Sequence, residues 1–309
     1  MDVSIAICTW NRAKRLNRTL QQLCSVRVPE RLDWELLVVE NRCTDETPAV
    51  IQSYADRLPI RRLLEPALGV SNARNCALRE AQGDLLIFTD DDILMDEDRI
   101  DAYTSAARRW PNAGYFGGLI APLYDREPPA WFRAHEHILG PYIGEAHDLG
   151  AAERVFGPNE WPWGGNMAFR RVAFQTTSFA ANLGRRGRER TAGGELAYCQ
   201  ALVAAGFEGV WVPTARVQHL VEAERLGLGF IRRNFVGQGV TDVRFQGNAK
   251  GVALMFGVPR WLILETVRLH LRYFWQRTTR NPGWFISFLD AARARGALSE
   301  HWRQRRSRT

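Results

Sequence analysis

The sequence contains few cysteines and no close pair of them. Its five cysteines are scattered among 309 residues, their number is odd, and none forms a Cys-x-x-Cys pair. This excludes a disulfide framework and a thiolate zinc site, and it indicates a reducing compartment. His135 and His137 have no further ligand at zinc-binding spacing, so they do not predict a zinc site either.

Long apolar runs are also absent. No stretch of 18 uncharged apolar residues occurs, so the sequence predicts no membrane-spanning helix. The first residues, MDVSIAICTWNR, lack the basic region and the apolar run of a signal peptide. We therefore expect a cytoplasmic protein.

The charge is unbalanced toward the positive sign. The net charge is +7 and the pI is about 9.5, which suits an anionic ligand, an anionic membrane surface or nucleic acid. No nucleic-acid-binding module is recognisable, so we expect no nucleic-acid partner. The last residues contain six arginines and one acid, which leaves a solvated end and a membrane or partner contact both open. These arginines are Arg293, Arg295, Arg303, Arg305, Arg306 and Arg308, and the acid is Glu300.

The first 110 residues alternate apolar strands with helical stretches. We expect strands at 3–9, 35–40, 60–64 and 84–89, and helices at 12–23, 48–54, 71–81 and 97–109, with Ser71 as an N-cap. Continuous apolar strands alternating with helices predict an α/β fold with a parallel, doubly wound sheet. Ligands bind such sheets at the carboxyl ends of the strands, so the residues after each strand are the candidates for chemistry.

The rest of the chain changes in character. Prolines and tryptophans between residues 122 and 162 predict an irregular, loop-rich segment. A strand at 164–170, a helix at 195–205 and a strand at 209–212 should follow. The residues from about 225 onward are rich in arginine and aromatic side chains, and we expect them to be helical.

Three consecutive carboxylates follow the strand expected at 84–89. Asp90, Asp91 and Asp92 repel each other at the end of a buried strand unless a cation neutralises them. Mg²⁺ or Mn²⁺ is commonly held by one or two carboxylates together with substrate phosphates. A solvated turn before an acidic helix start is the structural alternative.

Polar groups follow the other strands as well. Thr9–Trp10–Asn11–Arg12 follows the first strand, Glu40–Asn41–Arg42–Cys43–Thr44–Asp45 ends the second, and Gly69–Val70–Ser71–Asn72–Ala73–Arg74–Asn75 opens the third helix. Loops are polar in general, but the joint occurrence of these segments before the three aspartates favours a ligand crevice.

The order of these segments resembles the family-2 glycosyltransferases with the GT-A fold. The resemblance rests on CTWNR, VVENRCTDET, GVSNARNCAL and GDLLIFTDDD, and it continues with WGGNMAFRR and GGELAYCQALVAAGF. It covers about residues 3–220. It implies a GT-A (Rossmann-like), mostly parallel central sheet flanked by helices. The domain should span 1–224, with a donor half to about 118 and an acceptor half from 119, before a helical, basic extension at 225–309.

The resemblance also implies roles for individual residues on the donor side. Thr9, Asn11 and Arg12 should lie by the donor nucleotide, Glu40 by its base or ribose, and Arg74 in the same pocket. Asp90 and Asp92 resemble the outer carboxylates of the metal motif, with Asp91 between them beside the donor. His219 resembles a histidine near the metal or the diphosphate, although a structural role is its ordinary alternative.

On the acceptor side, Glu195 resembles the acid that deprotonates the acceptor hydroxyl. Glu189 and Glu160 are the alternative bases. Trp161, Trp163, Gly164, Gly165 and Asn166 should line the acceptor side, because indole faces suit sugar rings and glycines permit close approach.

The sequence therefore predicts an inverting, metal-assisted glycosyltransferase of polysaccharide or cell-envelope biosynthesis. It would move a sugar from a sugar nucleotide to a glycan or a lipid-linked acceptor, with Mn²⁺ or Mg²⁺ as the cofactor. A non-catalytic sugar-nucleotide-binding protein and a metal-dependent nucleotidyltransferase are the alternatives. The nucleotidyltransferase would normally have a glycine-rich loop after the first strand, and CTWNRAKR contains no glycine.

The extension at 225–309 has two interpretations. Residues 229–235 and 261–275 mix apolar and aromatic residues with arginine, as in a basic amphipathic helix on the inner face of an anionic membrane. The alternative is that these helices pack on the rest of the protein. The oligomeric state does not follow from the sequence.

Overall fold

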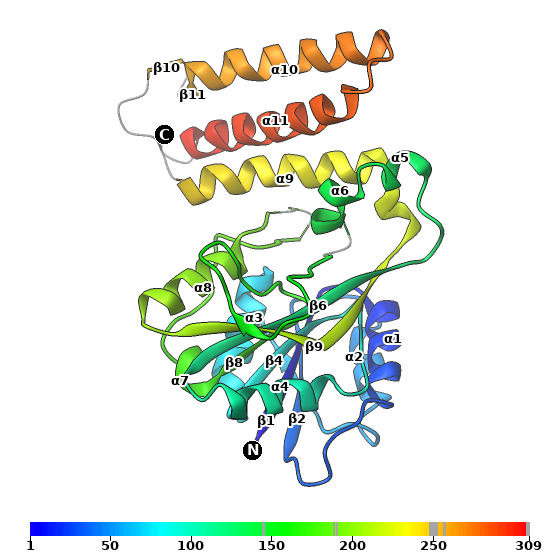
Figure 1. Ribbon diagram of the computed structural model, residues 1–309, viewed down its shortest axis with the longest axis vertical. Coiled ribbons are helices and arrows are strands. Elements are labelled where there is room, and N and C mark those ends of the chain that lie inside the picture. The colour runs from blue at the N-terminus through cyan, green and yellow to red at the C-terminus, as the bar shows by residue number, and fades with distance from the viewer. Residues whose placement is uncertain (144–145, 188, 190, 247–252, 256–257, 307–309) are drawn as a thin grey trace. The chain divides into compact units, whose positions relative to one another are not determined.

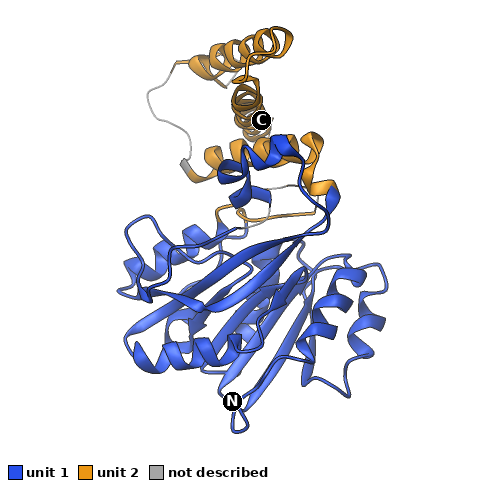
Figure 2. Cartoon of the chain, turned by 45° about the vertical axis from the view of Figure 1, so that its right-hand side comes forward, with its two compact units in different colours: residues 1–181, 194–223 blue, residues 182–193, 224–309 orange. Residues whose placement is uncertain are grey.

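The computed structural model describes residues 1–309 except 144–145, 188, 190, 247–252, 256–257 and 307–309. The described residues form two compact units (Figure 2). The first consists of Met1–Ala181 and Gly194–Ala223, and the second of Asn182–Gly193 and Glu224–Thr309. None of the described helices is both long and apolar enough to cross a membrane.

The first unit is built on a nine-stranded sheet with the order β3-β2-β1-β4-β8-β6-β9-β5, in which β7 also pairs with β9 (Figure 1). Its strands are β1 (Val3–Thr9), β2 (Trp34–Glu40), β3 (Ile60–Leu64), β4 (Leu85–Asp90), β5 (Ile93–Met95), β6 (Ala113–Tyr124), β7 (Arg154–Val155), β8 (Met167–Arg170) and β9 (Glu208–Val221). The α/β class expected from the sequence is confirmed.

Strand direction divides the sheet. The four strands from β3 to β4 are parallel, as the alternating pattern predicts. β8 runs antiparallel to both β4 and β6, and β5 and β7 run antiparallel to β9. The sequence did not predict β5 or β6, and it predicted only the first part of β9.

Helices cover both faces of the sheet. Those of this unit are α1 (Ala13–Leu23), α2 (Thr47–Gln52), α3 (Val70–Glu80), α4 (Arg99–Arg109), α5 (Ala130–Arg133), α6 (Glu136–Ile143), α7 (Arg171–Phe174) and α8 (Gly194–Ala204). Alternate residues of β1 point to opposite faces, so Ile5 packs with α1, α2 and α4, whereas Ala6 packs with α3, α7 and α8. Two apolar cores result, one on each side of the sheet.

The start of α3 differs from the prediction. The helix begins at Val70, and Ser71 lies buried in its first turn instead of capping it. The side chain of Asn41 fixes this start, because its Oδ1 accepts a hydrogen bond from Gly69 N at 2.7 Å. Its Nδ2 donates to the carbonyls of Glu65 and Ala67 at 3.1 and 2.7 Å. The residue after β2 therefore positions the helix that carries Arg74.

The second unit is mainly helical, as expected. It contains the 3₁₀ helix η1 (Ala223–Leu226, whose first residue belongs to the first unit), α9 (Leu228–Gln246), β10 (Leu254–Met255), β11 (Val258–Pro259), α10 (Arg260–Thr278) and α11 (Trp284–Arg306). α9 and α11 approach closely at two glycines. A Cβ on Gly239 would lie 1.8 Å from Arg293 O, and one on Gly296 would lie 1.9 Å from Val236 O.

Candidate functional site

The carboxyl ends of three neighbouring strands carry the candidate donor residues. The register sets Thr9 beside Glu40 and Cys8 beside Asp90, so the ends of β1, β2 and β4 meet at one edge. The backbone turns sharply after two of them, because Asn11 and Arg42 have φ angles of 51° and 62°. Left-handed conformations are uncommon outside glycine, and they are typical of constrained positions at functional sites.

Asn11 and Asp45 hold these two turns together. Asn11 Oδ1 accepts a hydrogen bond from Thr44 N at 2.7 Å. Asp45 accepts one from Ala13 N at 3.0 Å, and others from the amide and hydroxyl of Thr47. Burial raises the pKa of Asp45, but the hydrogen bonds from Thr47 and Ala13 outweigh it and leave this pKa below its usual value. Asp45 therefore accepts hydrogen bonds from the first residues of both α1 and α2 and acts as a charged cap for each helix.

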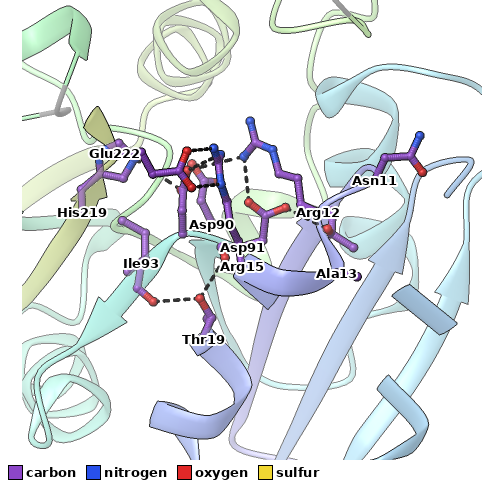
Figure 3. A network of polar contacts seen from close by, with 12 residues as sticks. Asn11, Arg12, Ala13, Arg15, Thr19, Asp90, Asp91, Ile93, His219 and Glu222 are labelled. Atoms are coloured by element: carbon purple, nitrogen blue, oxygen red, sulfur yellow. Dashed lines mark hydrogen bonds and ion pairs between the residues drawn. The ribbon is translucent and has the colours of Figure 1, made fainter. Parts of the chain in front are cut away.

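Asp91 lies in the interior and binds the end of β1 (Figure 3). Its carboxylate accepts hydrogen bonds from Thr9 Oγ1 and Arg12 Nη1, both at 2.8 Å. The charge of Asp91 raises the pKa of Arg12, although burial acts in the opposite direction. Asp91 therefore fixes two of the predicted donor residues.

Asp92 lies between a histidine and two arginines. Its Oδ1 is 3.3 Å from His219 Nε2, and its Oδ2 is 3.4 Å from Arg15 Nη1 and 3.5 Å from Arg12 Nη1. The pairing of β5 with β9 produces this arrangement, because Ile93 is opposite His219 and Leu220 N donates to Asp92 O at 3.0 Å. The structure thus brings Asp92 and His219 together, as the resemblance implies.

Arg15 and Glu222 belong to this cluster and were not predicted. Arg15 Nε donates to Glu222 Oε1 at 2.8 Å, and its Nη2 also pairs with this carboxylate (Figure 3). Arg15 lies three residues after Arg12 on α1, and residues at this spacing share one helix face. That spacing was the signal available in the sequence. Glu222 follows three residues after His219 and carried no comparable signal.

Arg74 connects the three aspartates with the predicted base. This arginine is buried, and its Nη1 donates to Glu195 Oε1 at 2.6 Å, whereas its Nη2 is 3.8 Å from Asp90 Oδ1. Burial lowers the pKa of Arg74, but Glu195 and Asp90 raise it more, so the guanidinium stays charged. Glu195 and Asp90 each keep about a quarter of their side chains exposed, at 24% and 23%.

Gly164 lies directly against this ion pair. A Cβ at this position would be 2.3 Å from Arg74 Nη2 and 2.6 Å from Glu195 Oε1. Gly165 is buried beside it, and Trp163 is partly buried, with its ring stacked on His147 at 4.8 Å between centroids. The segment 163–165 therefore lies at the site, and Gly164 needs its small size there.

Asn166 differs from the acceptor-side position expected of it. It is completely buried, and its Oδ1 accepts hydrogen bonds from Arg99 Nε at 2.9 Å and Tyr103 Oη at 2.8 Å. Its Nδ2 donates to Leu119 O at 3.0 Å and Ala215 O at 2.7 Å. All of its amide groups are thus used inside the fold, so its side chain supports the segment 163–165 and does not face an acceptor.

Glu40 and the alternative bases pair with other arginines. Glu40 is buried and its carboxylate pairs with Arg62 on β3. Glu160 accepts two hydrogen bonds from Arg154, which together with Gly157 N lower its pKa to about 2. Glu189 belongs to the second unit, where it pairs with Arg244 and Arg303. Of the three candidate bases, Glu195 alone pairs with an arginine that also adjoins the three aspartates.

The site offers a small number of protein ligands for a metal ion. No group of three or more His, Cys, Asp or Glu residues suited to hold one occurs in the described part of the chain. Asp92 and His219 nevertheless place a carboxylate oxygen and an imidazole nitrogen side by side, and Asp90 lies on the same turn. Such a set fits a divalent cation that takes its other ligands from a diphosphate.

Comparisons with known proteins identify the family of the chain. The family model for glycosyl transferase family 2 matches residues 4–177. The N-acetylglucosaminyl-diphospho-decaprenol L-rhamnosyltransferase of Mycobacterium tuberculosis is 30% identical over 244 residues, which are 70% of this chain and 75% of that protein. The chain belongs to glycosyl transferase family 2.

A second curated relative and a solved structure add to this comparison. The succinoglycan biosynthesis protein ExoM of Rhizobium meliloti is 30% identical over 136 residues, which are 43% of each chain, so the match spans less than half of this relative. Among solved structures, the mannosyltransferase PcManGT of Pyrobaculum calidifontis in complex with GDP-Man and Mn²⁺ has a TM-score of 0.60 at 16% identity. The match covers 98% of this chain and 87% of that one. At this identity the likeness establishes the fold.

Proposed function

We propose that the protein transfers a sugar, with inversion, from a nucleotide-diphosphate donor to a hydroxyl group of a glycan or a lipid-linked acceptor. The observation that carries this proposal is the cluster formed by Arg74, Glu195 and the Asp90–Asp92 turn. The buried Arg74 pairs with Glu195, the proposed base, and lies 3.8 Å from Asp90 in the proposed cation-binding turn. Sugar transfer needs both groups. The base deprotonates the acceptor hydroxyl, and the cation offsets the negative charge on the leaving diphosphate.

The donor would bind at the ends of β1, β2 and β4. Thr9, Asn11 and Arg12 follow β1, and their places are fixed by Asp91 and by the loop after β2. Glu40 and Arg74 would complete the pocket for the nucleotide. The solved structures of similar fold support a sugar nucleotide as the donor, because one is in complex with GDP-Man and a second, of Staphylococcus aureus TarS, with UDP-GlcNAc.

Asp92, His219 and Asp90 would hold Mn²⁺ or Mg²⁺, and Mn²⁺ is present in the mannosyltransferase structure. When bound, the cation would offset the negative charge that grows on the departing diphosphate. The guanidinium groups of Arg12 and Arg15 already lie within 3.5 Å of Asp92 and would contribute positive charge at the same place. The diphosphate would then leave without protonation by an acid.

Glu195 would act as the base. Its carboxylate accepts the proton of the acceptor hydroxyl while the hydroxyl oxygen bonds to the anomeric carbon from the face opposite the nucleotide. The bond between this carbon and the diphosphate oxygen breaks, and the nucleoside diphosphate leaves with the electron pair. Arg74 holds the carboxylate in place through its 2.6 Å hydrogen bond. The transition state would resemble an oxocarbenium ion.

Replacement of the base tests the proposal. Glu195→Gln should lower kcat by about 10²–10⁴-fold, since the amide cannot accept the proton. The assay follows release of nucleoside diphosphate, because release of pyrophosphate would instead indicate a nucleotidyltransferase. Glu208→Gln, at an exposed glutamate of the same unit, is the matched control and should keep full turnover. Full turnover by Glu195→Gln would disprove the role of Glu195.

Donor binding is tested separately. The melting temperature should rise with one of UDP-, GDP-, dTDP- or CMP-sugars, because a ligand that binds the native state stabilises it. This rise should depend on Mn²⁺ or Mg²⁺ and should be lost in Asp92→Asn. A donor that stabilises the protein without any turnover would favour the non-catalytic binding protein instead.

A further inference from the structure

Helix α10 has a buried face and an exposed apolar face. One face is buried in the second unit and includes Leu262, Thr266 and Gln276. Six large apolar side chains of the same helix are exposed by more than half of their surface. They are Trp261 (58%), Leu264 (69%), Val267 (54%), Leu271 (66%), Phe274 (70%) and Trp275 (62%).

The exposed side chains form one continuous stripe. At 3.6 residues per turn, the six positions fall within an arc of about 140° on the side of the helix opposite Leu262, Thr266 and Gln276. They are therefore not the rim of the buried face. The stripe extends from Trp261 to Trp275, which is about 21 Å at 1.5 Å per residue. A soluble surface rarely exposes so many large apolar groups together, and such patches mark interaction sites.

The charges around the stripe are almost all positive. α10 carries Arg260, Arg268, Arg272 and Arg277 against a single acid, Glu265, which pairs with Arg268 at 2.7 Å. Tryptophans stand near the two ends of the stripe. A helix with an apolar arc, flanking arginines and tryptophans at its ends has the composition of helices that lie in the headgroup region of an anionic bilayer.

The other helix with this composition has no such face. In α9, Phe230, Ile231 and Phe235 are buried, with exposures of 8%, 0% and 6%. Of the two segments considered from the sequence, α9 therefore packs inside the second unit, and only α10 offers its apolar side chains to solvent. Since no described helix can cross a membrane, α10 would lie parallel to the surface.

We propose that the stripe Trp261–Trp275 of α10 binds the interfacial region of an anionic phospholipid bilayer. The apolar side chains would enter the headgroup and upper acyl region, and the arginines would contact the phosphates. A second copy of the chain is the competing occupant, but Arg260, Arg268 and Arg272 of each helix would bring like charges together at such a contact. Binding to the bilayer needs neither donor nor acceptor, so this proposal is tested independently of sugar transfer.

Vesicle flotation of the full-length protein tests this proposal. The wild type should bind vesicles of phosphatidylcholine mixed with phosphatidylglycerol and should bind pure phosphatidylcholine far more weakly. The triple variant Trp261→Ser, Phe274→Ser, Trp275→Ser should lose at least about 100-fold in partitioning. The double variant Arg268→Gln, Arg272→Gln should lose about 30-fold, and only on anionic vesicles.

The control replaces exposed valines outside the stripe. Val172→Ser together with Val203→Ser, at positions 60% and 57% exposed, should bind as the wild type does. All variants change exposed side chains, so their melting temperatures and their turnover with a water-soluble acceptor should stay unchanged. Equal vesicle binding by the wild type and the triple variant would overturn the proposal. So would a wild-type dimer that ignores vesicles and dissociates in the triple variant.

Discussion

Gly164 controls the space beside the proposed base. Alanine at this position would place a methyl group 2.3 Å from Arg74 Nη2 and 2.6 Å from Glu195 Oε1. These are side-chain atoms and could move, but Arg74 is buried, and its movement would break the pair that positions Glu195. The substitution should therefore lower the rate of the reaction more than it lowers the stability of the fold.

We expect Gly164→Ala to lower kcat by about 10²-fold, as for a displaced catalytic group, while the melting temperature changes little. Gly140→Ala is the matched control, since its added methyl group would meet only Ala146 Cβ at 3.4 Å within a helix. Steady-state kinetics and thermal denaturation of the two variants measure both effects. Wild-type kcat in Gly164→Ala would contradict a positioning role for the ion pair.

His147 makes stability depend on pH. Burial lowers the pKa of His147 to about 4, against weaker effects of a backbone hydrogen bond at Trp161 and of nearby acids. The folded state thus prefers the neutral ring, which stacks on Trp163. Between pH 6.5 and 4 the unfolded chain binds more protons than the folded chain, so stability falls as the pH drops through this window.

We expect this histidine to cost about 3 kcal/mol of unfolding free energy across that window. His147→Phe keeps an aromatic ring against Trp163 and should remove this part of the pH dependence. The measurement is urea unfolding at several pH values, with His137→Phe, at an exposed histidine, as the control. The idea fails if the wild type and His147→Phe lose stability in parallel as the pH falls.

At the scale of helices and strands, the sequence predicted the donor half well. β1 and β3 have the predicted bounds, β2 begins one residue earlier and β4 is shifted by one residue, because uninterrupted apolar runs define buried parallel strands. The residues that follow β1, β2 and β4 meet at one edge of the sheet, as expected of parallel strands.

β6 and β9 were harder to predict because each contains residues that usually interrupt strands. β6 includes Pro122, which is tolerated since β8 pairs only with Tyr115–Gly117 and leaves that part of the strand open on one side. β9 contains Pro213, and the register with β6 shifts between Gly118 and Ile120. Beyond this irregularity β9 continues to Val221 and brings His219 to Asp92.

The contacts of the site that the sequence did not predict are side-chain hydrogen bonds between segments that are distant in the sequence. Asn166 follows two glycines in a segment of the expected motif, and its sequence context gave no sign that Arg99 and Tyr103 of α4 would bind its amide oxygen. Arg15 likewise pairs with Glu222 over a distance of 207 residues along the chain. Such contacts follow from tertiary packing, which local patterns do not specify.

At the scale of the whole molecule, the two units differ from the division expected at residue 224. Residues 182–193 belong with the C-terminal helices, since Ala192 N donates to Thr241 Oγ1 at 2.8 Å and Arg244 reaches Glu189. A cut at 224 would separate this segment from the helices that bind it. Functional assays should therefore use the chain with its C-terminal helices in place.

Each unit has its own buried polar network, so we expect two calorimetric transitions that respond to different substitutions. Asn166→Ala removes the side-chain oxygen that accepts hydrogen bonds from Arg99 Nε and Tyr103 Oη, and it should destabilise the first unit by about 2–4 kcal/mol. Arg244→Met removes the 2.9 Å pair with the buried Glu300 and should destabilise the second unit by a similar amount. Asn112→Ala, at an exposed asparagine, should shift neither transition. Because the two networks share no residue, each variant should lower one transition and leave the other in place, whereas a single transition lowered by both variants would mean that the units unfold together.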